Sequence, residues 1–108
     1  MKKPSPITKG TANEFLVAAN LMSRGYDVFK ALSHNSSCDL IVLERARIYR
    51  IEVKTLSNKA KRNVKIPYSI KKMSQENKDK FDILAVVYKR KIEYYPPLPR
   101  FYEIALNK

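Results

Sequence analysis

Apolar residues recur at helical spacing near the start of the chain. The positions that follow this period are Phe15, Ala18, Ala19 and Met22. They predict a helix over residues 8–24, with Gly25 as its stop signal. Thr11 and Glu14 also match the spacing of a capping box, which would place both residues in the first turn of this helix.

Three short apolar runs follow the predicted helix, and each has the pattern of a strand. Residues 26–32 alternate but are apolar on more than one face, and residues 40–43 and 48–53 form the other two runs. The corner at residues 45–47 is short, which favours an antiparallel hairpin between the second and third strands. The polar residues 33–37 indicate a loop.

The second half of the chain predicts a helix and then two strands. Residues 68–80 suit a polar helix. Residues 81–89 form the most apolar run of the sequence and predict a central strand, and residues 91–96 predict its short partner. The tail over residues 98–108 suits either a further strand or a short helix.

This order of elements predicts an α/β sandwich with a mixed sheet of four to five strands, flanked by helices. The long crossover before residues 81–89 allows that strand to run parallel to a neighbour. A chain of 108 residues fits one domain, which we expect over residues 8–108. Residues 1–7 are expected to form a flexible basic arm.

The charge balance favours a polyanionic partner. The chain has 22 Lys and Arg against 10 Asp and Glu, a formal net charge of +12 and a pI near 9.9. Trp is absent and no long helix opposes a basic face to an aromatic one, so nucleic acid is expected rather than a membrane. The single cysteine, Cys38, and the lack of an apolar N-terminal stretch predict a cytoplasmic protein.

Charged residues interrupt the hydrophobic pattern of the predicted hairpin. Because side chains alternate along a strand, Glu52 and Lys54 share one face and their apolar neighbours take the other. If Asp39 lies opposite Glu52, the tip of the hairpin falls at residues 45–46 and Asp39 joins that face. Two carboxylates this close repel each other unless a cation separates them, and their hard oxygen ligands suit Mg²⁺.

These residues supply the parts that phosphodiester hydrolysis needs. Asp39 and Glu52 would hold the metal, with the Val53 carbonyl as a further ligand. Lys54, ~7 Å from Glu52 along the strand, would orient the attacking water or stabilise the developing charge. Glu14 lies at the margin of the apolar stripe of its helix, and its carboxylate would reach the edge of the site. The alternatives are a capping role for Glu14 and an exposed salt bridge between Lys54 and the acids.

The same residues resemble a known nuclease superfamily. Asp39, a spacer of twelve residues and the sequence Glu-Val-Lys at 52–54, preceded by a helix with Glu14, look like the PD-(D/E)XK nuclease superfamily. Within it, residues 8–55 and 81–96 are similar to group I intron homing endonucleases and, next, to archaeal Holliday junction resolvases. The residue before Asp39 is Cys38 rather than proline, and the homing enzymes of this type are longer.

The resemblance implies a restriction-endonuclease-like fold and cleavage of DNA, double-stranded or branched, with Mg²⁺ or with Mn²⁺ in its place. It also implies a homodimer or homotetramer that cuts two strands with two sites. Carried over position by position, it gives the catalytic set Glu14, Asp39, Glu52 and Lys54. Two other functions stay open, which are structure-selective cleavage by a junction resolvase and a non-catalytic nucleic-acid-binding module.

Basic and polar residues around the predicted site are candidate contacts to DNA phosphates, which give affinity rather than sequence readout. The set comprises Lys9, His34, Ser36, Lys59, Lys61, Arg62, Lys65, Lys71 and Lys72. His34 is equally consistent with an exposed loop histidine. Aromatic residues near the end of the chain could stack on bases or lie in the core, and we expect an oligomer interface; they are Tyr94, Tyr95, Phe101 and Tyr102.

Overall fold

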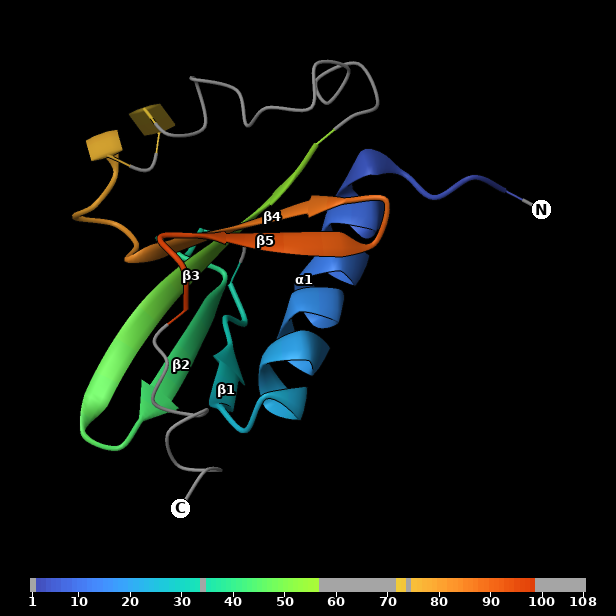
Figure 1. Cartoon of the computed structure of the whole chain (residues 1–108). Coiled ribbons are helices and arrows are strands. Elements are labelled where there is room, and N and C mark those ends of the chain that lie inside the picture. Colours follow the sequence, from blue (N-terminus) through green and yellow to red (C-terminus); the bar gives the residue numbers. More distant parts are fainter. Residues whose placement is uncertain (1, 34, 57–71, 74, 99–108) are drawn as a thin grey trace.

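One long helix and five strands form the described part of this computed structural model, which comprises residues 2–33, 35–56, 72–73 and 75–98. In chain order the elements are α1 (Pro6–Ser23), β1 (Asp27–Lys30), β2 (Leu40–Glu44), β3 (Arg47–Thr55), β4 (Ile83–Tyr88) and β5 (Lys91–Tyr95). The helix lies along one side of the sheet (Figure 1). The predicted α/β fold with a mixed sheet is confirmed, and α1 is the helix that the described residues place against it.

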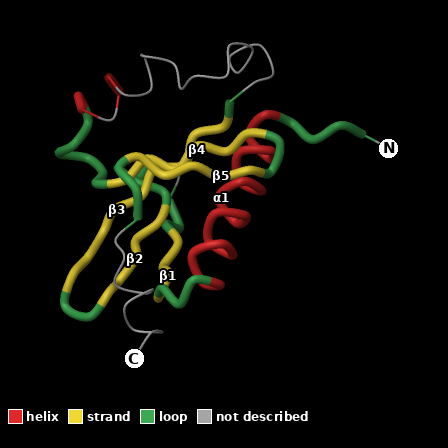
Figure 2. The backbone as a smooth tube through the Cα atoms, viewed as in Figure 1, coloured by secondary structure: helices red, strands yellow, loops and turns green. Residues whose placement is uncertain are grey.

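The sheet has the order β1-β2-β3-β4-β5, in which only β3 and β4 run parallel. The predicted hairpin of β2 and β3 is confirmed, because Glu44 pairs with Arg47 and the tip falls at residues 45–46. The apolar run that forms β4 is an internal strand, as predicted (Figure 2). Of the predicted helix over residues 68–80, the structure describes residues 72–73 and 75–80. Residues 72–73 and 75–76 are helical and residues 77–80 form a turn, and the Asn77 N–H donates to the Met73 carbonyl at 3.1 Å. The tail lies outside the described residues except for its first residue.

The N-terminus of α1 differs from the prediction. Ser5 is the N-cap residue, and its hydroxyl oxygen accepts the Thr8 N–H at 3.1 Å. Pro6 occupies the first turn, where its missing N–H is not needed. Thr11 therefore lies inside the helix, where its hydroxyl donates to the Ile7 carbonyl at 3.1 Å. The predicted capping box of Thr11 and Glu14 is wrong, which leaves the Glu14 carboxylate available for tertiary contacts.

The C-terminus of α1 closes in a Schellman motif that turns the chain into β1. Gly25 has a φ of 93°, which favours glycine. The Tyr26 N–H donates to the Leu21 carbonyl at 3.1 Å, and the Gly25 N–H donates to the Met22 carbonyl at 3.0 Å. Tyr26 and Leu21 are both buried in the same apolar cluster. The predicted stop at Gly25 thus also packs β1 beneath the helix.

Apolar clusters cover both faces of the sheet. The cluster beneath α1 includes Val17, Leu21, Leu40, Val42, Ile51, Ile83, Ala85, Val87 and Tyr94, and the cluster on the opposite face consists of Cys38, Phe81, Leu84 and Val86. Because alternate residues of β4 enter each cluster, this strand is apolar throughout. Cys38 is a small core residue, as predicted, but it precedes β2 rather than belonging to it.

Tyr94 corrects one prediction about the aromatic residues. The alternation of β5 turns its ring beneath α1, where it is 8% exposed. Its hydroxyl donates to the Asn20 Oδ1 at 2.6 Å. Tyr94 is therefore a core residue and not part of an oligomer interface. Tyr95 points to the opposite face and packs against the cluster of Cys38, while Phe101 and Tyr102 lie outside the described residues.

Candidate active site

Asp39 and Glu52 lie opposite each other where β2 begins. The Asp39 N–H donates to the Ile51 carbonyl at 3.0 Å, and the next residue, Leu40, pairs with Ile51. This register places Asp39 across from Glu52 on the neighbouring strand. Both side chains are partly buried. The structure thus brings the two carboxylates together in the register that the alternation of the sequence predicts.

The backbone of β3 holds the side chain of Asp39. Its Oδ2 accepts the Val53 N–H at 2.8 Å. The N–H and C=O of one strand residue point toward the same neighbouring strand, so the Val53 carbonyl is directed to the side on which Asp39 lies. Since Leu40 is the first residue of β2 and pairs with Ile51, β2 does not cover the edge of β3 from Val53 to Thr55. This uncovered segment is called the open edge of β3 below.

The pKa of Glu52 is raised to about 8. Desolvation of the partly buried carboxyl is the largest cause, followed by the hydrogen bond to Asp39 and the negative charges of Asp39 and Glu14, while Lys54 acts in the opposite direction. In the absence of a cation, the Glu52 carboxyl therefore keeps its proton near neutral pH. A divalent cation between the Asp39 and Glu52 carboxyls would replace that proton and favour both ionised forms.

Lys54 lies on the same face of β3 as Glu52. Glu52 pairs with Leu84 and Lys54 with Val86, and both partners belong to the cluster on the face away from α1. The Lys54 side chain is exposed. It makes no ion pair with the carboxylates among the described residues, so the alternative of a structural salt bridge with the acids is not formed there.

Glu14 approaches the site from α1 and is paired with a lysine of β1. The Lys30 Nζ lies 2.7 Å from the Glu14 Oε1, and the two side chains are only 28% and 22% exposed. The same Nζ lies 5.2 Å from the centre of the Phe15 ring. Glu14 is near enough to Glu52 to contribute to the raised pKa of that group. The sequence prediction omitted Lys30; its signal is a lysine at the position where the core-facing alternation of β1 would place an apolar residue.

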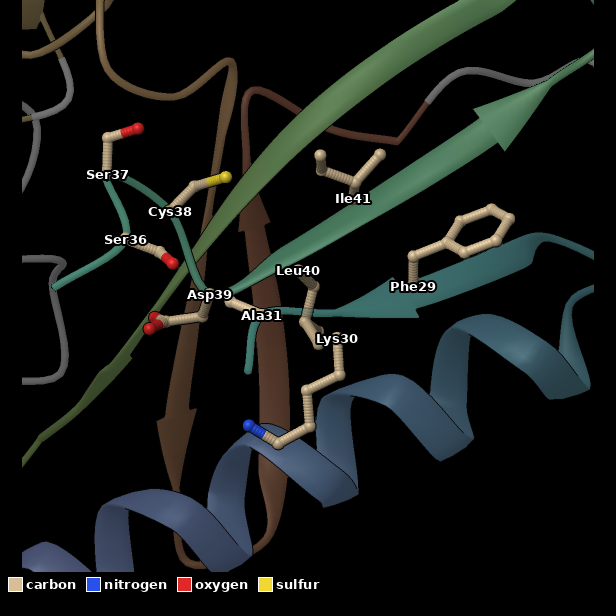
Figure 3. Close-up of a pocket in the computed structure, with 9 residues that line it drawn as sticks. All are labelled: Phe29, Lys30, Ala31, Ser36, Ser37, Cys38, Asp39, Leu40 and Ile41. Carbon is tan, nitrogen blue, oxygen red and sulfur yellow. The ribbon is translucent and has the colours of Figure 1, made fainter. Parts of the chain in front are cut away.

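Two cavities flank the loop that leads into Asp39. One, of about 340 Å³, is lined by Lys30 and Asp39 among others, and Figure 3 shows Lys30 extending from β1 toward α1. The other, of about 520 Å³, is lined by Glu52 and Lys80 among others. Ser36 lines both cavities. A cavity therefore adjoins each carboxylate, on the two sides of one loop.

The donor atoms present fit a hard divalent cation that keeps several waters. No three Asp, Glu, His or Cys side chains converge on one point within the described ranges. The donors that do meet are the carboxylate oxygens of Asp39 and Glu52, and the Val53 carbonyl is directed to the side on which Asp39 lies. Mg²⁺ is usually bound through one or two carboxylates with waters completing its shell. Glu14, paired with Lys30, stands outside this donor set.

Three of the predicted DNA contacts belong to the described residues. Lys9 is exposed on α1, and Ser36 lies in the loop before Asp39. The Lys72 Nζ lies 3.7 Å from the Glu76 Oε1, and such an exposed pair one helical turn apart is weak. The other predicted contacts lie outside the described residues; they are His34, Lys59, Lys61, Arg62, Lys65 and Lys71.

Residues 5–103 match the family described as PD-(D/E)XK endonuclease. This chain belongs to the PD-(D/E)XK endonuclease family. The solved structure of a bacterial homing endonuclease, I-Ssp6803I, is similar to this PD-(D/E)XK endonuclease with a TM-score of 0.63 and 17% sequence identity, over 93% of this chain and 74% of that chain. This likeness concerns the fold. No curated protein matches the sequence.

Family membership supports nuclease activity for this PD-(D/E)XK endonuclease and confirms the resemblance on which the restriction-endonuclease-like fold was predicted. Nucleases of this family act on DNA and generally use divalent metals. No helix in the part of the chain that the structure describes has the length and hydropathy needed to cross a membrane.

Proposed function

We propose that this PD-(D/E)XK endonuclease hydrolyses DNA phosphodiester bonds with Mg²⁺, or Mn²⁺ in its place, held by Asp39 and Glu52. The observation that carries the proposal is the meeting of these two carboxyls across β2 and β3, with the pKa of Glu52 raised to about 8. A net charge of +12 supports DNA as the polyanion. A merely structural acid pair would be expected to have a basic partner, and neither Asp39 nor Glu52 forms an ion pair among the described residues.

Asp39, Glu52 and the Val53 carbonyl are the proposed ligands. The Val53 N–H occupies one oxygen of Asp39 and so fixes the orientation of that carboxylate, which leaves lone pairs of the other oxygen for the metal. Glu52 would lose its proton on binding the metal. When bound, Mg²⁺ would polarise the scissile phosphate and lower the pKa of a bound water.

Lys54 and Glu14 have separate proposed roles. The exposed Lys54 ammonium would lie against the scissile phosphate, where it stabilises the charge that develops during attack or orients the water. Glu14 would accept a hydrogen bond from water near the metal, with Lys30 fixing its position. Because Glu14 is already paired, its removal is expected to reduce cleavage less than removal of Glu52.

The test is a supercoiled-plasmid cleavage assay with Mg²⁺ and, separately, Mn²⁺. Wild type is compared with Glu52→Gln and Lys54→Ala, and with Arg47→Ala as a control that removes a cation from the distant end of the same strand. We expect cleavage by wild type and Arg47→Ala only, with all four proteins binding DNA in EDTA. Binding without cleavage by the wild-type protein under either metal would instead identify a non-catalytic nucleic-acid-binding module.

Two finer aspects of the proposal are the form of the DNA and the assembly. Cutting both strands of a duplex in one encounter calls for two active sites, so we propose that the enzyme acts as a homodimer or homotetramer, which mass measurement by light scattering would test. The same plasmid preparation, linearised, is compared with a four-way junction. Preferential cutting of the junction would favour a resolvase over an endonuclease that acts on linear duplex.

A further inference from the structure

A third cavity, of about 640 Å³, lies beyond the open edge of β3. Figures 1 and 2 both show the turn between β4 and β5 beside the N-terminal part of α1, and the cavity lies between these two elements. Its lining consists of Lys9, Asn13, Thr55, Leu56, Val87, Lys89 and Arg90. We call it the basic cleft.

The charges of the basic cleft have one sign. Three of its lining residues are cations, Lys9 from α1 and Lys89 and Arg90 from the turn, and none is an acid. None of the three forms an ion pair with a carboxylate in the described ranges, although the Lys89 Nζ lies 5.4 Å from the centre of the Tyr88 ring. Cations from two separate elements therefore converge, and no carboxylate of the described residues neutralises them, which favours an anionic ligand.

The turn keeps its cations in an unfavourable backbone conformation. Tyr88 pairs with Lys91, so Lys89 and Arg90 alone form the turn, and their φ values are 48° and 66°. Turns of two residues with positive φ at both positions prefer Asn-Gly or Gly-Gly, because a side chain is strained there. Strain of this kind is often retained at functional sites. Stability alone would favour Asn-Gly here rather than Lys-Arg.

The basic cleft adjoins the candidate active site along β3, but it lies on the face of the sheet that α1 covers, whereas Glu52 and Lys54 lie on the other face. Thr55 directly follows Lys54, and its hydroxyl accepts a hydrogen bond from the Asn13 Nδ2 at 2.7 Å, which joins α1 to β3 between the two sites. From Glu52 to Thr55, β3 spans ~10 Å. One strand of DNA rises about 3.4 Å per nucleotide along the helix axis. A strand whose scissile phosphate lies at Glu52 would therefore place a phosphate about three nucleotides away at the basic cleft.

We propose that the basic cleft binds a backbone phosphate of the DNA strand that is cut, through Lys9, Lys89 and Arg90. The inference rests on the proposed function, because it takes DNA as the ligand and the active site as the point of cleavage. The contact is to phosphate and therefore positions the strand without reading its sequence. It explains both the strained turn and the unneutralised cations.

The test compares two arginines at hairpin tips. Arg90→Gly and Arg45→Gly each remove one cation and relieve one non-glycine residue with positive φ, since Arg45 has a φ of 54° in the turn between β2 and β3. Binding of a short fluorescent DNA duplex is measured in EDTA at several salt concentrations. For Arg90→Gly we expect roughly 3- to 10-fold weaker binding and a slope of log K against log salt that is smaller by about 0.9. Arg45→Gly should leave both quantities near wild type, and Lys9→Gln should behave like Arg90→Gly.

Cleavage of plasmid with Mg²⁺ separates the inference from the proposed function. A wild-type protein that binds the duplex with the expected loss in Arg90→Gly, but does not cut, supports the basic cleft and overturns the nuclease proposal. If the wild-type protein cuts plasmid but Arg90→Gly and Arg45→Gly bind the duplex equally well, with equal salt slopes, the proposed role of the basic cleft is overturned. The nuclease proposal then stands. The melting temperature of Arg90→Gly is expected to be at least that of wild type, because glycine relieves the strain.

Discussion

The Asp39 Oδ2 lies 2.8 Å from the Val53 nitrogen and accepts its N–H at the open edge of β3. Asp82 makes the same contact on the β4 side of that strand, where its Oδ2 accepts the Arg50 N–H at 2.8 Å. The surroundings of the two aspartates differ, however. Asp82 also binds the Arg50 guanidinium at 2.9 Å, which lowers the pKa of Asp82. Asp39 instead adjoins Glu52 and forms no ion pair within the described residues. One geometry therefore serves a structural aspartate and a proposed metal ligand.

Replacing each aspartate by asparagine separates these two roles. Asp39→Asn keeps an oxygen that can accept the Val53 N–H, so we expect a melting temperature near wild type but a loss of cleavage of roughly 100-fold or more. Asp82→Asn loses its ion pair with Arg50, and we expect a decrease of about 1 kcal/mol in the free energy of unfolding with cleavage retained. Urea unfolding and plasmid cleavage measure the two effects. Equal effects of both changes on cleavage would contradict the assignment of Asp39.

The raised pKa of Glu52 predicts how stability depends on pH in the absence of metal. Its folded-state pKa of about 8 lies above the ordinary value of 4.5, so the folded protein binds the extra proton. The contribution of this group is fully present below pH 4.5, and stability decreases as the pH rises from there through about 8. In EDTA the melting temperature of wild type should therefore decrease relative to Glu52→Gln over that range. Added Mg²⁺ should reduce the difference, and parallel pH profiles in EDTA would contradict the shift.

The sequence predicts the arrangement of Asp39, Glu52 and Lys54 because all three lie on or next to one hairpin, that of β2 and β3. A strict period of two places Glu52 and Lys54 on one face. The short corner around residues 45–47 allows more than one register, and the structure adopts the one with its tip at residues 45–46, which brings Asp39 opposite Glu52. The prediction starts the first helix at residue 8, whereas α1 begins at Pro6. Two capping signals compete in this segment, and the Ser5–Pro6 signal determines the start rather than that of Thr11. Strand alternation and capping residues can be recognised in the sequence, but only the packed structure shows which of two competing signals determines the element.

Contacts between distant elements could not be predicted in the same way. The pairing of Glu14 with Lys30 depends on how α1 crosses β1, and no spacing along the chain encodes that angle. The turn formed by Lys89 and Arg90 contains neither Gly nor Asn, so the usual turn signal is absent although both residues have positive φ. The residues that the sequence leaves unassigned are thus those whose role arises from tertiary packing or strain.

The ion pair of Glu14 with Lys30 predicts a measurable coupling. The Glu14→Gln and Lys30→Gln variants and their combination form a double-mutant cycle, for which we expect a coupling energy of about 1 kcal/mol in urea unfolding, since the pair is partly buried. For cleavage, Lys30→Gln should raise the Mg²⁺ concentration needed for half-maximal rate, because Glu14 is no longer held in place. Additive effects on both quantities would show that Lys30 does not position Glu14.

The hydrogen bond between Tyr94 and Asn20 predicts a purely structural effect. Tyr94→Phe removes the donor at 2.6 Å from the Asn20 Oδ1, so we expect the free energy of unfolding to decrease by about 1 kcal/mol. Tyr95→Phe is the matched control, because the Tyr95 hydroxyl binds Glu93 at an exposed position and should contribute less. Plasmid cleavage should be unchanged in both variants.

Burial also raises the pKa of Tyr94 to about 12, from an ordinary value of 10. The stability that Tyr94 contributes is therefore present below pH 10 and decreases as the pH rises through about 12, and Tyr94→Phe should lack this decrease. Light scattering compares the mass of the assembly formed by wild type with that formed by Tyr94→Phe. Because Tyr94 lies in the core beneath α1, we expect the two masses to be equal. A change in mass without a change in stability would instead place Tyr94 in a subunit interface and contradict its position in the core.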